Sequence, residues 1–483
     1  MRIFDSWFKG PSNTSRSENI EDYAIKKIPS HYRWPIPAII LVLIGNSTAL
    51  FFFTFGAKLS FTVGWPLMLL PLTYLFIGSS LIGMVMIHLA SKEGLTVDMM
   101  TRGMGFGYIG SAVTSFIYGI NFIFYFLLEG TIVTNAISFS FNLQVHSFES
   151  IMVFAAVGLL KLVLVWYGMK ELQIFQTWGA LLYSVLLGVA IYMLVSNFDV
   201  VGPSQWLPIE PISIDSLGMA FMLANGQVVF QGLMATDYGR FAKSDTGYRG
   251  GFICMVGMLA PLIGNMLIGP LFAYTLMHSM NDKSAMTYAD PGYIFPLIMG
   301  VWGSIFVLIT QIRINVMNLY SASLALSNSF SLIFNFTPGR PWWMVAVYIF
   351  GCFFYAVNIL NYLDIFLAIT GILTNTWILI LLVDHFICKK LLNYGPSDFV
   401  EYRRPFLFKW NPTGVFSLAI GVIIGAIGVL EFYPIYYSSF LAMISGAIIH
   451  IILTIMTNGQ YYFAKFPTDR ETKWNESLKR EVK

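Results

Sequence analysis

Residues 217–243 read LGMAFMLANGQVVFQGLMATDYGRFAK, an apolar run that Asn225-Gly226-Gln227 interrupts and that ends in the polar stretch 236–243. About twenty residues of this hydrophobicity are enough to cross a bilayer as a helix. Carboxamides in the middle of such a span are costly unless they and the backbone face protein or a water-filled cavity. We therefore expect a broken membrane helix here, a device with which secondary transporters build binding sites.

The composition of the whole chain agrees with a membrane protein. Of the 483 residues, 57% are hydrophobic and only 11% are charged, and the mean hydropathy is +0.69, whereas soluble domains carry about 25% charged residues. The three cysteines have no paired spacing and the six histidines are scattered, so we expect no disulfide framework, no metal site and no cofactor. The first apolar run is too long for a cleavable signal peptide.

Twelve apolar segments are long enough to cross a membrane. We expect these spans near 35–57, 65–88, 107–137, 150–168, 172–195, 217–236, 250–277, 293–326, 342–359, 362–388, 413–430 and 434–457. The predicted fold class is an all-α integral membrane protein with one transmembrane domain over 35–457. An N-terminal arm, 1–34, and a tail, 458–483, flank this domain.

Basic residues gather on alternate connections of this predicted bundle. If both chain ends are cytoplasmic, the outer connections hold only Lys58 and Lys283, and the outer loop 196–216 is acidic. Cytoplasmic loops carry an excess of Lys and Arg. We therefore expect a multi-pass protein of the plasma membrane, monomeric, with both termini in the cytoplasm. Its partners would be the lipid bilayer and a small-molecule substrate, and the basic clusters reflect topology rather than nucleic-acid binding.

A second polar interruption lies near the start of the chain. Gly45-Asn46-Ser47-Thr48 breaks the first apolar segment, as the carboxamides break the sixth. The two segments are five spans apart and so run in opposite directions. This arrangement is typical of two inverted five-helix repeats. We place the repeats at about 35–195 and 217–388, with two extra helices at about 413–457.

Span three places an ionisable group at membrane depth. Glu129 lies one helical turn after Tyr125 and Phe126. Acids at this depth mark ion or substrate paths, although a structural ion pair is an alternative. The two rings are suited to stacking on a planar ligand or to packing alone. We take all three as candidate substrate-binding residues and Glu129 also as a candidate ion-coupling group.

Carboxamides recur on one face of span eight. Gln311, Asn315 and Asn318 are three or four residues apart and so share a helix face. Their donors and acceptors suit the amide edge of a heterocycle, and hydrogen bonds between helices are the alternative role. Arg313 lies on another face, with Glu129 as its candidate ion-pair partner. The candidate substrate site is completed by Asn46, Asn225, Gly226, Gln227, Asn315 and Asn318.

Further polar groups lie toward the cytoplasmic ends of the spans. Asp237 and Arg240, one turn apart, form either an inner gate or a local ion pair. Lys161 lies close enough to the end of span four for its side chain to extend to the interface. Asp384-His385 and Lys389-Lys390 indicate a polar end of span ten.

Four sequence elements carry a family resemblance. They are Gly94-Leu95-Thr96 with 102–107 (RGMGFG) before span three, 236–240 (TDYGR) closing span six, 318–321 (NLYS) in span eight and 410–414 (WNPTG) entering span eleven. In this order they resemble elements of the nucleobase–cation symporter family, which includes cytosine, purine and allantoin permeases and a hydantoin transporter. The resemblance covers roughly 35–430. It implies twelve helices, a LeuT-type five-plus-five fold, and import of a nucleobase or related cyclic amide by alternating access.

The chain departs from that family where the substrate and the ion bind. The family usually has Trp-Phe-Gly-x-Gln where residues 125–129 read YFLLE, and Phe230 is the ring nearest to the predicted break in span six. Arg313 stands where the resemblance places the sodium-binding hydroxyls of span eight. A guanidinium repels a cation and offers it no acceptor. The sequence therefore favours proton-coupled or uncoupled transport over sodium coupling, with Glu129 and Arg313 as the coupling residues.

Two other functions fit the sequence. The same fold could carry an amino acid, an amine or another charged solute, since Glu129 could pair with a cation. A non-transporting sensor is the third hypothesis, although the tail 458–483 contains no recognisable output module. The chain has no phosphate loop and no nucleophile elbow, so we do not expect an enzyme.

Overall fold

The computed structural model describes residues 26–166, 169–280, 285–336, 338–355 and 362–467. Within this part of the chain the regular structure is helical, apart from one isolated bridge between Trp34 and Ala242. Ten helices are long and apolar enough to cross a membrane, or eleven if the bent pair α3 and α4 is one span. The predicted all-α, multi-pass membrane protein is confirmed, while the described helices do not reach the predicted count of twelve. Most of the predicted arm and tail, 1–25 and 468–483, lies outside the described residues.

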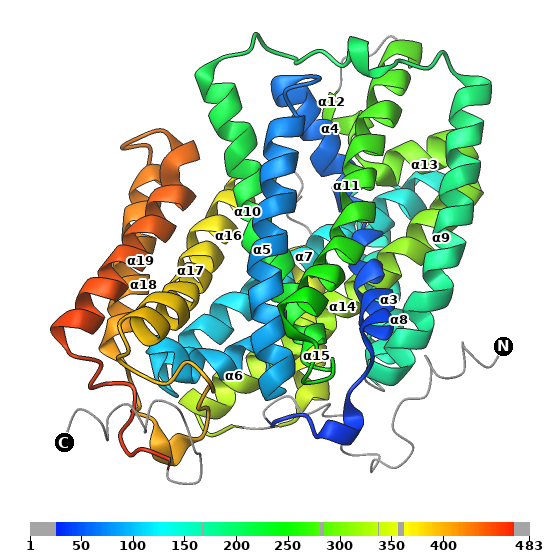
Figure 1. The fold of residues 1–483 in the computed structure, drawn as a ribbon. Coiled ribbons are helices and arrows are strands. Elements are labelled where there is room, and N and C mark those ends of the chain that lie inside the picture. The colour runs from blue at the N-terminus through cyan, green and yellow to red at the C-terminus, as the bar shows by residue number, and fades with distance from the viewer. Residues whose placement is uncertain (1–25, 167–168, 281–284, 337, 356–361, 468–483) are drawn as a thin grey trace.

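The helices follow one another along the chain with short connections (Figure 1). The first half contains η1 (Ser30–Tyr32), α3 (Ile36–Ser47), α4 (Phe51–Val63), α5 (Leu69–Glu93), α6 (Val97–Thr101), η2 (Arg102–Phe106), α7 (Gly110–Ser140), α8 (Phe148–Val165), α9 (Met169–Asn197) and η3 (Pro203–Gln205). The second half contains α10 (Ile214–Gly239), α11 (Gly247–Met280), α12 (Ala285–Tyr288), α13 (Pro291–Met299), α14 (Val301–Ile333), α15 (Arg340–Phe354), α16 (Leu363–Thr370), η5 (Gly371–Asn375), α17 (Thr376–Val383) and η6 (Asp384–Leu391). The last helices are η7 (Arg404–Phe406), α18 (Pro412–Val429), η8 (Ile435–Tyr437) and α19 (Ser438–Met456).

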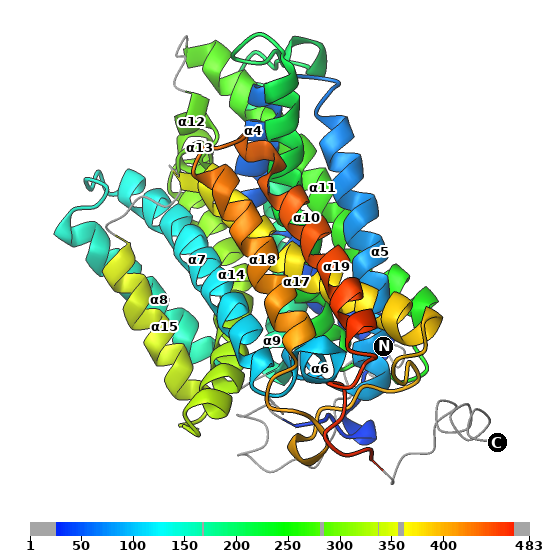
Figure 2. The same ribbon diagram turned by 90° about the vertical axis from the view of Figure 1, so that its left-hand side faces the viewer.

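Two helices form the centre of the bundle. In the apolar stretch of each helix, 83% of α14 and 78% of α10 is buried, against 28% for the span 178–197 of α9. Helices α18 and α19 lie side by side at one edge, and Figure 2 shows α8 and α15 side by side at another. The end of the bundle that carries α6 also carries Arg33, Lys92 and Lys243, and we name it the basic face. The opposite face carries α4 and α12 (Figure 1).

The predicted break in span one is confirmed. Helices α3 and α4 meet at 58° across residues 48–50. Side chains from other helices bond the freed backbone groups: the Asn265 amide donates to the Ser47 carbonyl at 2.6 Å, and the Leu50 N–H donates to Gln311 Oε1 at 3.2 Å. Because these groups are satisfied by protein, the irregular backbone is tolerated at membrane depth.

The predicted break in span six is wrong, because α10 is helical without interruption from Ile214 to Gly239. Both carboxamides of this stretch find side-chain partners on neighbouring helices. Asn225 bonds Tyr74 and Ser439, and Gln227 bonds Tyr125 and Gln231. With the amides satisfied in this way, the helix does not need to unwind to accommodate them.

Three other spans differ in detail from the prediction. The segment 293–326 was expected as one helix, but Gly300, at φ +60°, separates α13 from α14, and α14 continues to Ile333. Helix α15 ends at Phe354, and the predicted continuation over 356–359 lies outside the described residues. Span ten contains two π-helical segments, η5 and η6, that its apolar pattern does not reveal.

Candidate functional site

A relay of side-chain hydrogen bonds connects three helices beside the break in span one. Asn46 Nδ2 donates to Gln231 Oε1 at 2.7 Å, and Gln231 Nε2 donates to Gln227 Oε1 at 2.8 Å. Gln227 Nε2 then donates to the Tyr125 hydroxyl at 2.7 Å. All four side chains are buried. The relay joins α3, α10 and α7, and it brings together three of the residues predicted for the site. Gln231 was missed, although it lies one turn after Gln227.

Aromatic rings enclose the Tyr125 end of this relay. The Tyr125 ring stacks on Phe230, with centroids 4.3 Å apart and planes 27° apart. Phe366 meets Tyr125 edge-on at 5.1 Å, and Phe51 does so at 6.0 Å. Phe51 begins α4, directly after the break. The arrangement therefore places a polar amide edge and flat apolar faces next to each other.

Glu129 lies at the other side of the break and is fully engaged with protein. Gln311 Nε2 donates to its carboxylate, and the same Gln311 accepts the N–H of Leu50 through Oε1. The charge of Lys161 on α8 lies within electrostatic reach. Lys161 was expected to reach the membrane interface, but it is only 1% exposed and its Nζ lies 5.5 Å from the centroid of the Phe126 ring. It is a buried countercharge.

Arg313 and Glu129 do not form the predicted ion pair. Among the ion pairs of the described residues, none joins these two side chains. The Arg313 side chain packs against Gly179 of α9: a Cβ atom on that glycine would lie 2.3 Å from Arg313 Cδ. Arg313 also interacts electrostatically with Tyr183. Its position on a different face of α14 from Gln311 explains the separation.

Two carboxamides of span eight, Gln311 and Asn315, bond α7. Asn315 Nδ2 donates to the Phe126 carbonyl at 3.0 Å, and Asn318 Nδ2 donates to Asn315 Oδ1 at 3.4 Å. In this conformation the amides hold the two helices together. They adjoin the Phe126 backbone rather than the relay.

Asn225 and Gly226 point away from the relay. Asn225 accepts from Tyr74 at 2.6 Å and donates to Ser439 at 2.8 Å, so it faces α5 and α19. A Cβ atom on Gly226 would lie 2.5 Å from the Leu367 carbonyl oxygen of α16. The prediction of 225–227 as one site assumes a broken helix. In an intact helix successive residues are about 100° apart, so these three residues face different neighbours.

Gly226→Leu should prevent normal packing of α10 on α16. The new side chain meets backbone, which cannot rotate away, and overpacking of this kind costs about 1–3 kcal/mol or more. We expect a lower melting temperature of the purified protein and loss of function together. Loss of ligand binding at unchanged melting temperature would instead place Gly226 at the ligand.

The two gate candidates fasten α10 to the helices around it at the basic face. The Tyr118 hydroxyl of α7 donates to Asp237 Oδ2 at 3.0 Å. Arg240 Nε donates to the Asp237 carbonyl at 3.1 Å, and its Nη2 donates to the Tyr320 hydroxyl of α14 at 3.2 Å. The predicted local contact between Asp237 and Arg240 thus includes a backbone bond, and both side chains also reach across to other helices.

The chain before α3 completes a closure at this end. The Trp34 N–H donates to the Phe241 carbonyl at 2.6 Å, and their rings stack at 5.6 Å. Arg33 Nη1 donates to the Ala242 carbonyl at 2.9 Å. Outside this closure lies a cavity of about 860 Å³ whose walls include Arg33, Lys92 and Lys243. At the opposite face a cavity of about 400 Å³ lies between α4, α7, α12 and α13.

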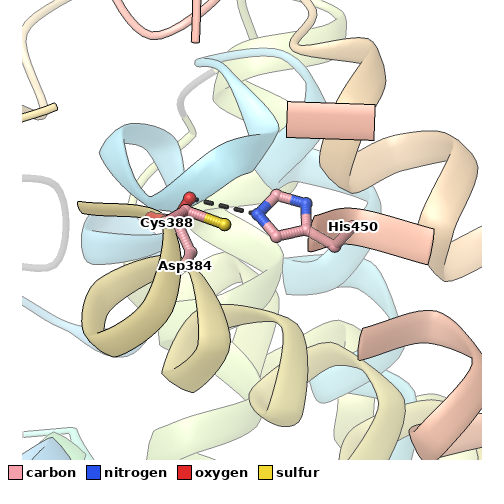
Figure 3. Close-up of side chains that lie close together, drawn as sticks. All are labelled: Asp384, Cys388 and His450. Atoms are coloured by element: carbon pink, nitrogen blue, oxygen red, sulfur yellow. Dashed lines mark hydrogen bonds and ion pairs between the residues drawn. The ribbon is translucent and has the colours of Figure 1, made fainter. Parts of the chain in front are cut away.

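One cluster at the end of span ten was not foreseen. Asp384, Cys388 and His450 bring their ligand atoms within 4.8 Å of one another, with the first two on η6 and the histidine on α19 (Figure 3). Lys389 Nζ lies 2.8 Å from Asp384 Oδ2 and also donates to the Gly103 carbonyl at 2.6 Å. The other oxygen, Oδ1, accepts from Tyr462 and lies 3.1 Å from His450 Nε2. Because an ammonium group already neutralises the carboxylate, these contacts fit a structural link between η6, α19 and η2 better than a metal centre.

The break in span one, the buried relay and the long apolar helices define an all-α bundle of membrane-spanning helices. No protein-family model and no curated protein matches the sequence. Among solved structures, the chain is similar to Mhp1, a nucleobase-cation-symport-1 family transporter, in a closed conformation with bromovinylhydantoin bound. That match has a TM-score of 0.67 at 14% identity and covers 95% of this chain and 98% of the other.

Two further structures match over nearly the whole chain. The inward-facing conformation of Mhp1 gives a TM-score of 0.61 at 17% identity, covering 91% of this chain and 94% of the other. A substrate-bound outward-open Na⁺-coupled sialic acid symporter gives 0.62 at 10% identity, covering 91% and 92%. These identities establish the fold alone. The LeuT-type fold predicted from the resemblance is confirmed.

Proposed function

We propose that the chain is a secondary transporter that imports a nucleobase or related cyclic amide by alternating access. The observation that carries this proposal is the relay from Asn46 to Tyr125, with the stacked pair Tyr125 and Phe230 at its end. A relay of carboxamides offers adjacent donors and acceptors, which a cyclic amide matches with its own C=O and N–H groups. The rings offer a stacking surface worth about 0.5–1.5 kcal/mol per aromatic pair.

The ligand would enter by replacing contacts that the closed protein makes with itself. A cyclic amide that bonds Gln227 replaces the hydrogen bond from Gln227 Nε2 to the Tyr125 hydroxyl. Its ring replaces either Tyr125 or Phe230 in their stack. The similar transporter that was solved with bromovinylhydantoin bound holds a ligand of this chemical class. Glu129 is less suited to a cationic solute, since Gln311 and Lys161 already compensate its charge.

A stabilisation screen on the purified protein tests the substrate class. Neutral cyclic amides (purines, pyrimidines, allantoin and hydantoins) are compared with amino acids and amines, each with and without sodium. A ligand present at about 100 times its Kd stabilises the folded state by about 2.7 kcal/mol, which is a rise of several degrees in melting temperature. Stabilisation by cyclic amides supports the proposal, and stabilisation by charged solutes alone rejects it.

For the coupling ion, we propose a proton or no ion rather than sodium. The Ser47 carbonyl at the break in span one, a type of group that binds sodium in the resembled family, accepts a bond from Asn265 here. Arg313, 0% exposed, brings a permanent charge to α14 where it packs on α9. The Arg313 guanidinium and the Asn265 amide would thus lie where a sodium ion needs oxygen ligands. Glu129 remains the titratable group beside the break.

Arg313→Ser should impair transport in the absence of sodium, because it removes a buried cation that helps to hold α14 against α9. The new hydroxyl also supplies an oxygen ligand, so partial rescue by sodium is the expected second result. Arg313→Lys, which keeps the charge, should show no sodium rescue. Uptake by the unmodified protein that saturates at millimolar sodium or below would contradict the proposal.

The proposed orientation places the basic face in the cytoplasm. Arg33, Lys92 and Lys243 lie at this face around the cavity of about 860 Å³. Cytoplasmic loops carry an excess of basic residues, which supports this orientation. Asp237 and Arg240 would then belong to an inner gate of a plasma-membrane protein, closed in this structure by Trp34 and Phe241.

A further inference from the structure

A pair of buried acids lies directly behind the gate residues. Asp98 on α6 and Asp237 on α10 are 2% and 1% exposed, and the charge of Asp237 acts on Asp98. One oxygen of each carboxylate, Asp98 Oδ1 and Asp237 Oδ1, is buried without a hydrogen-bond partner among the described residues. Two ionised carboxylates in one dry site repel each other and offer only acceptors. These two oxygens therefore lack a hydrogen-bond donor.

The helices α5, α7, α10, α14 and the π-helix η2 all pack on α6. From α7, Tyr118 donates to Asp237 and the Ser115 hydroxyl hydrogen-bonds Asp98. The charged and titratable groups that face the pair from these elements are Tyr118, Arg102 and Arg240, with Tyr320 reached through Arg240.

Arg102 and Arg240 also hydrogen-bond groups other than the two acids. Arg102 directs Nη2 to Asn328 and Nη1 to the Tyr402 carbonyl at 3.4 Å. Arg240 bonds the Asp237 backbone and the Tyr320 hydroxyl. Two unpartnered oxygens are too few to ligate a metal cation, and burial favours the neutral acid over the charged one. The small ligand that fits this acceptor-only site is therefore a proton.

We propose that Asp98 and Asp237 form a proton-binding site of the gate, which holds one proton while the gate is closed and releases it to the basic face when α6 and α10 separate. The proton supplies an O–H donor to a pair of acids that otherwise offers only acceptors. This inference rests on the proposed alternating-access function. Phe241 lies one helical turn after Asp237 and stacks on Trp34, and Arg33, next to Trp34, lines the 860 Å³ cavity.

The electrostatics of Asp98 agree with this site. Burial raises the pKa of Asp98 to about 7 and the charge of Asp237 raises it further in the same direction, against the lowering effects of Ser115, Arg102 and Arg240. In an open, hydrated gate the carboxyl would return to about 4. The closed state therefore binds the proton more tightly, so it gains stability as pH falls below about 7 and loses it as pH rises through about 7.

Distance measurements between spin labels test the site without any substrate. We would place labels at Ser244→Cys, just after α10, and at Lys409→Cys, beside the start of α7, both exposed. The background has the three free cysteines replaced by alanine. Between about pH 6 and about pH 8 the ratio of open to closed populations should rise about tenfold, as linkage with these two pKa values requires.

Asp98→Asn should reduce that rise to less than about twofold, and Asp237→Asn serves if the first variant does not fold. The exposed Asp245→Asn is the matched control and should keep the full rise. A parent protein without pH response, or Asp98→Asn with the full response, overturns the site. So does a distance change driven by sodium at constant pH with no effect of pH. Because no substrate is present, failure of the proposed transport function would not affect the result.

Discussion

Replacing Glu129 with glutamine should lower the stability of the protein. Glutamine keeps an acceptor for Gln311, so the lost feature is the negative charge. Lys161 would then be a buried ammonium group, 1% exposed, without its main countercharge. No direct ion pair joins these two side chains among those of the described residues, so the loss should stay below the about 3–5 kcal/mol that breaking a direct buried pair costs. Thermal unfolding of the purified protein in detergent measures the effect.

The double variant Glu129→Gln with Lys161→Met should recover most of the lost stability, because it removes both charges and fills the space with an apolar side chain. Glu149→Gln, an exposed acid at the start of α8, is the control and should change stability by less than about 0.5 kcal/mol. If the double variant is as unstable as the single one, Lys161 is not the partner of Glu129.

Gln231→Leu should weaken ligand binding strongly, with only a moderate loss of stability. This side chain accepts from Asn46 and donates to Gln227, so its removal leaves both relay partners without their bonds. Each lost bond to a buried polar group costs about 1–3 kcal/mol. A loss of this size in the bound state lowers affinity by about 5- to 150-fold. The Kd of the best ligand from the screen is the quantity to measure.

Asn225→Ala provides the matched control on the same helix. Asn225 is equally buried but bonds Tyr74 and Ser439, away from the relay. We expect lower stability at unchanged affinity. Equal losses of affinity in the two variants would mean that the helix as a whole, and not the relay, determines binding.

Much of the architecture could be predicted from the sequence because it depends on composition and on periodicity. The apolar segments located most spans within a few residues, and Gly45-Asn46-Ser47-Thr48 marked the true break in span one. The spacing of Gln311, Asn315 and Asn318 predicted a shared face, and in the structure Gln311 and Asn315 both bond α7 while Asn318 bonds Asn315. These features are local, so one segment of sequence is enough to reveal them.

The rest depends on partners that are distant in sequence. Asn225 and Gln227 suggested a break in span six because their partners, Tyr74 and Tyr125 among them, cannot be seen in that segment. Lys161 looked like an interfacial residue because its burial depends on the packing of α8 against α7 and α15, which are distant in sequence. Asp98 had no visible role until the fold brought α6 against the end of α10.

Uptake by the purified protein in proteoliposomes is the most direct test of the central claim that a neutral cyclic amide is transported through the Asn46–Tyr125 relay. Radiolabelled purines, pyrimidines, allantoin and hydantoins are offered without sodium, with and without a pH gradient. We expect accumulation or exchange of at least one of them, strongly reduced by Gln231→Leu and retained by Asn225→Ala. Failure to take up any of these compounds, by a protein that is folded and inserted, would contradict it.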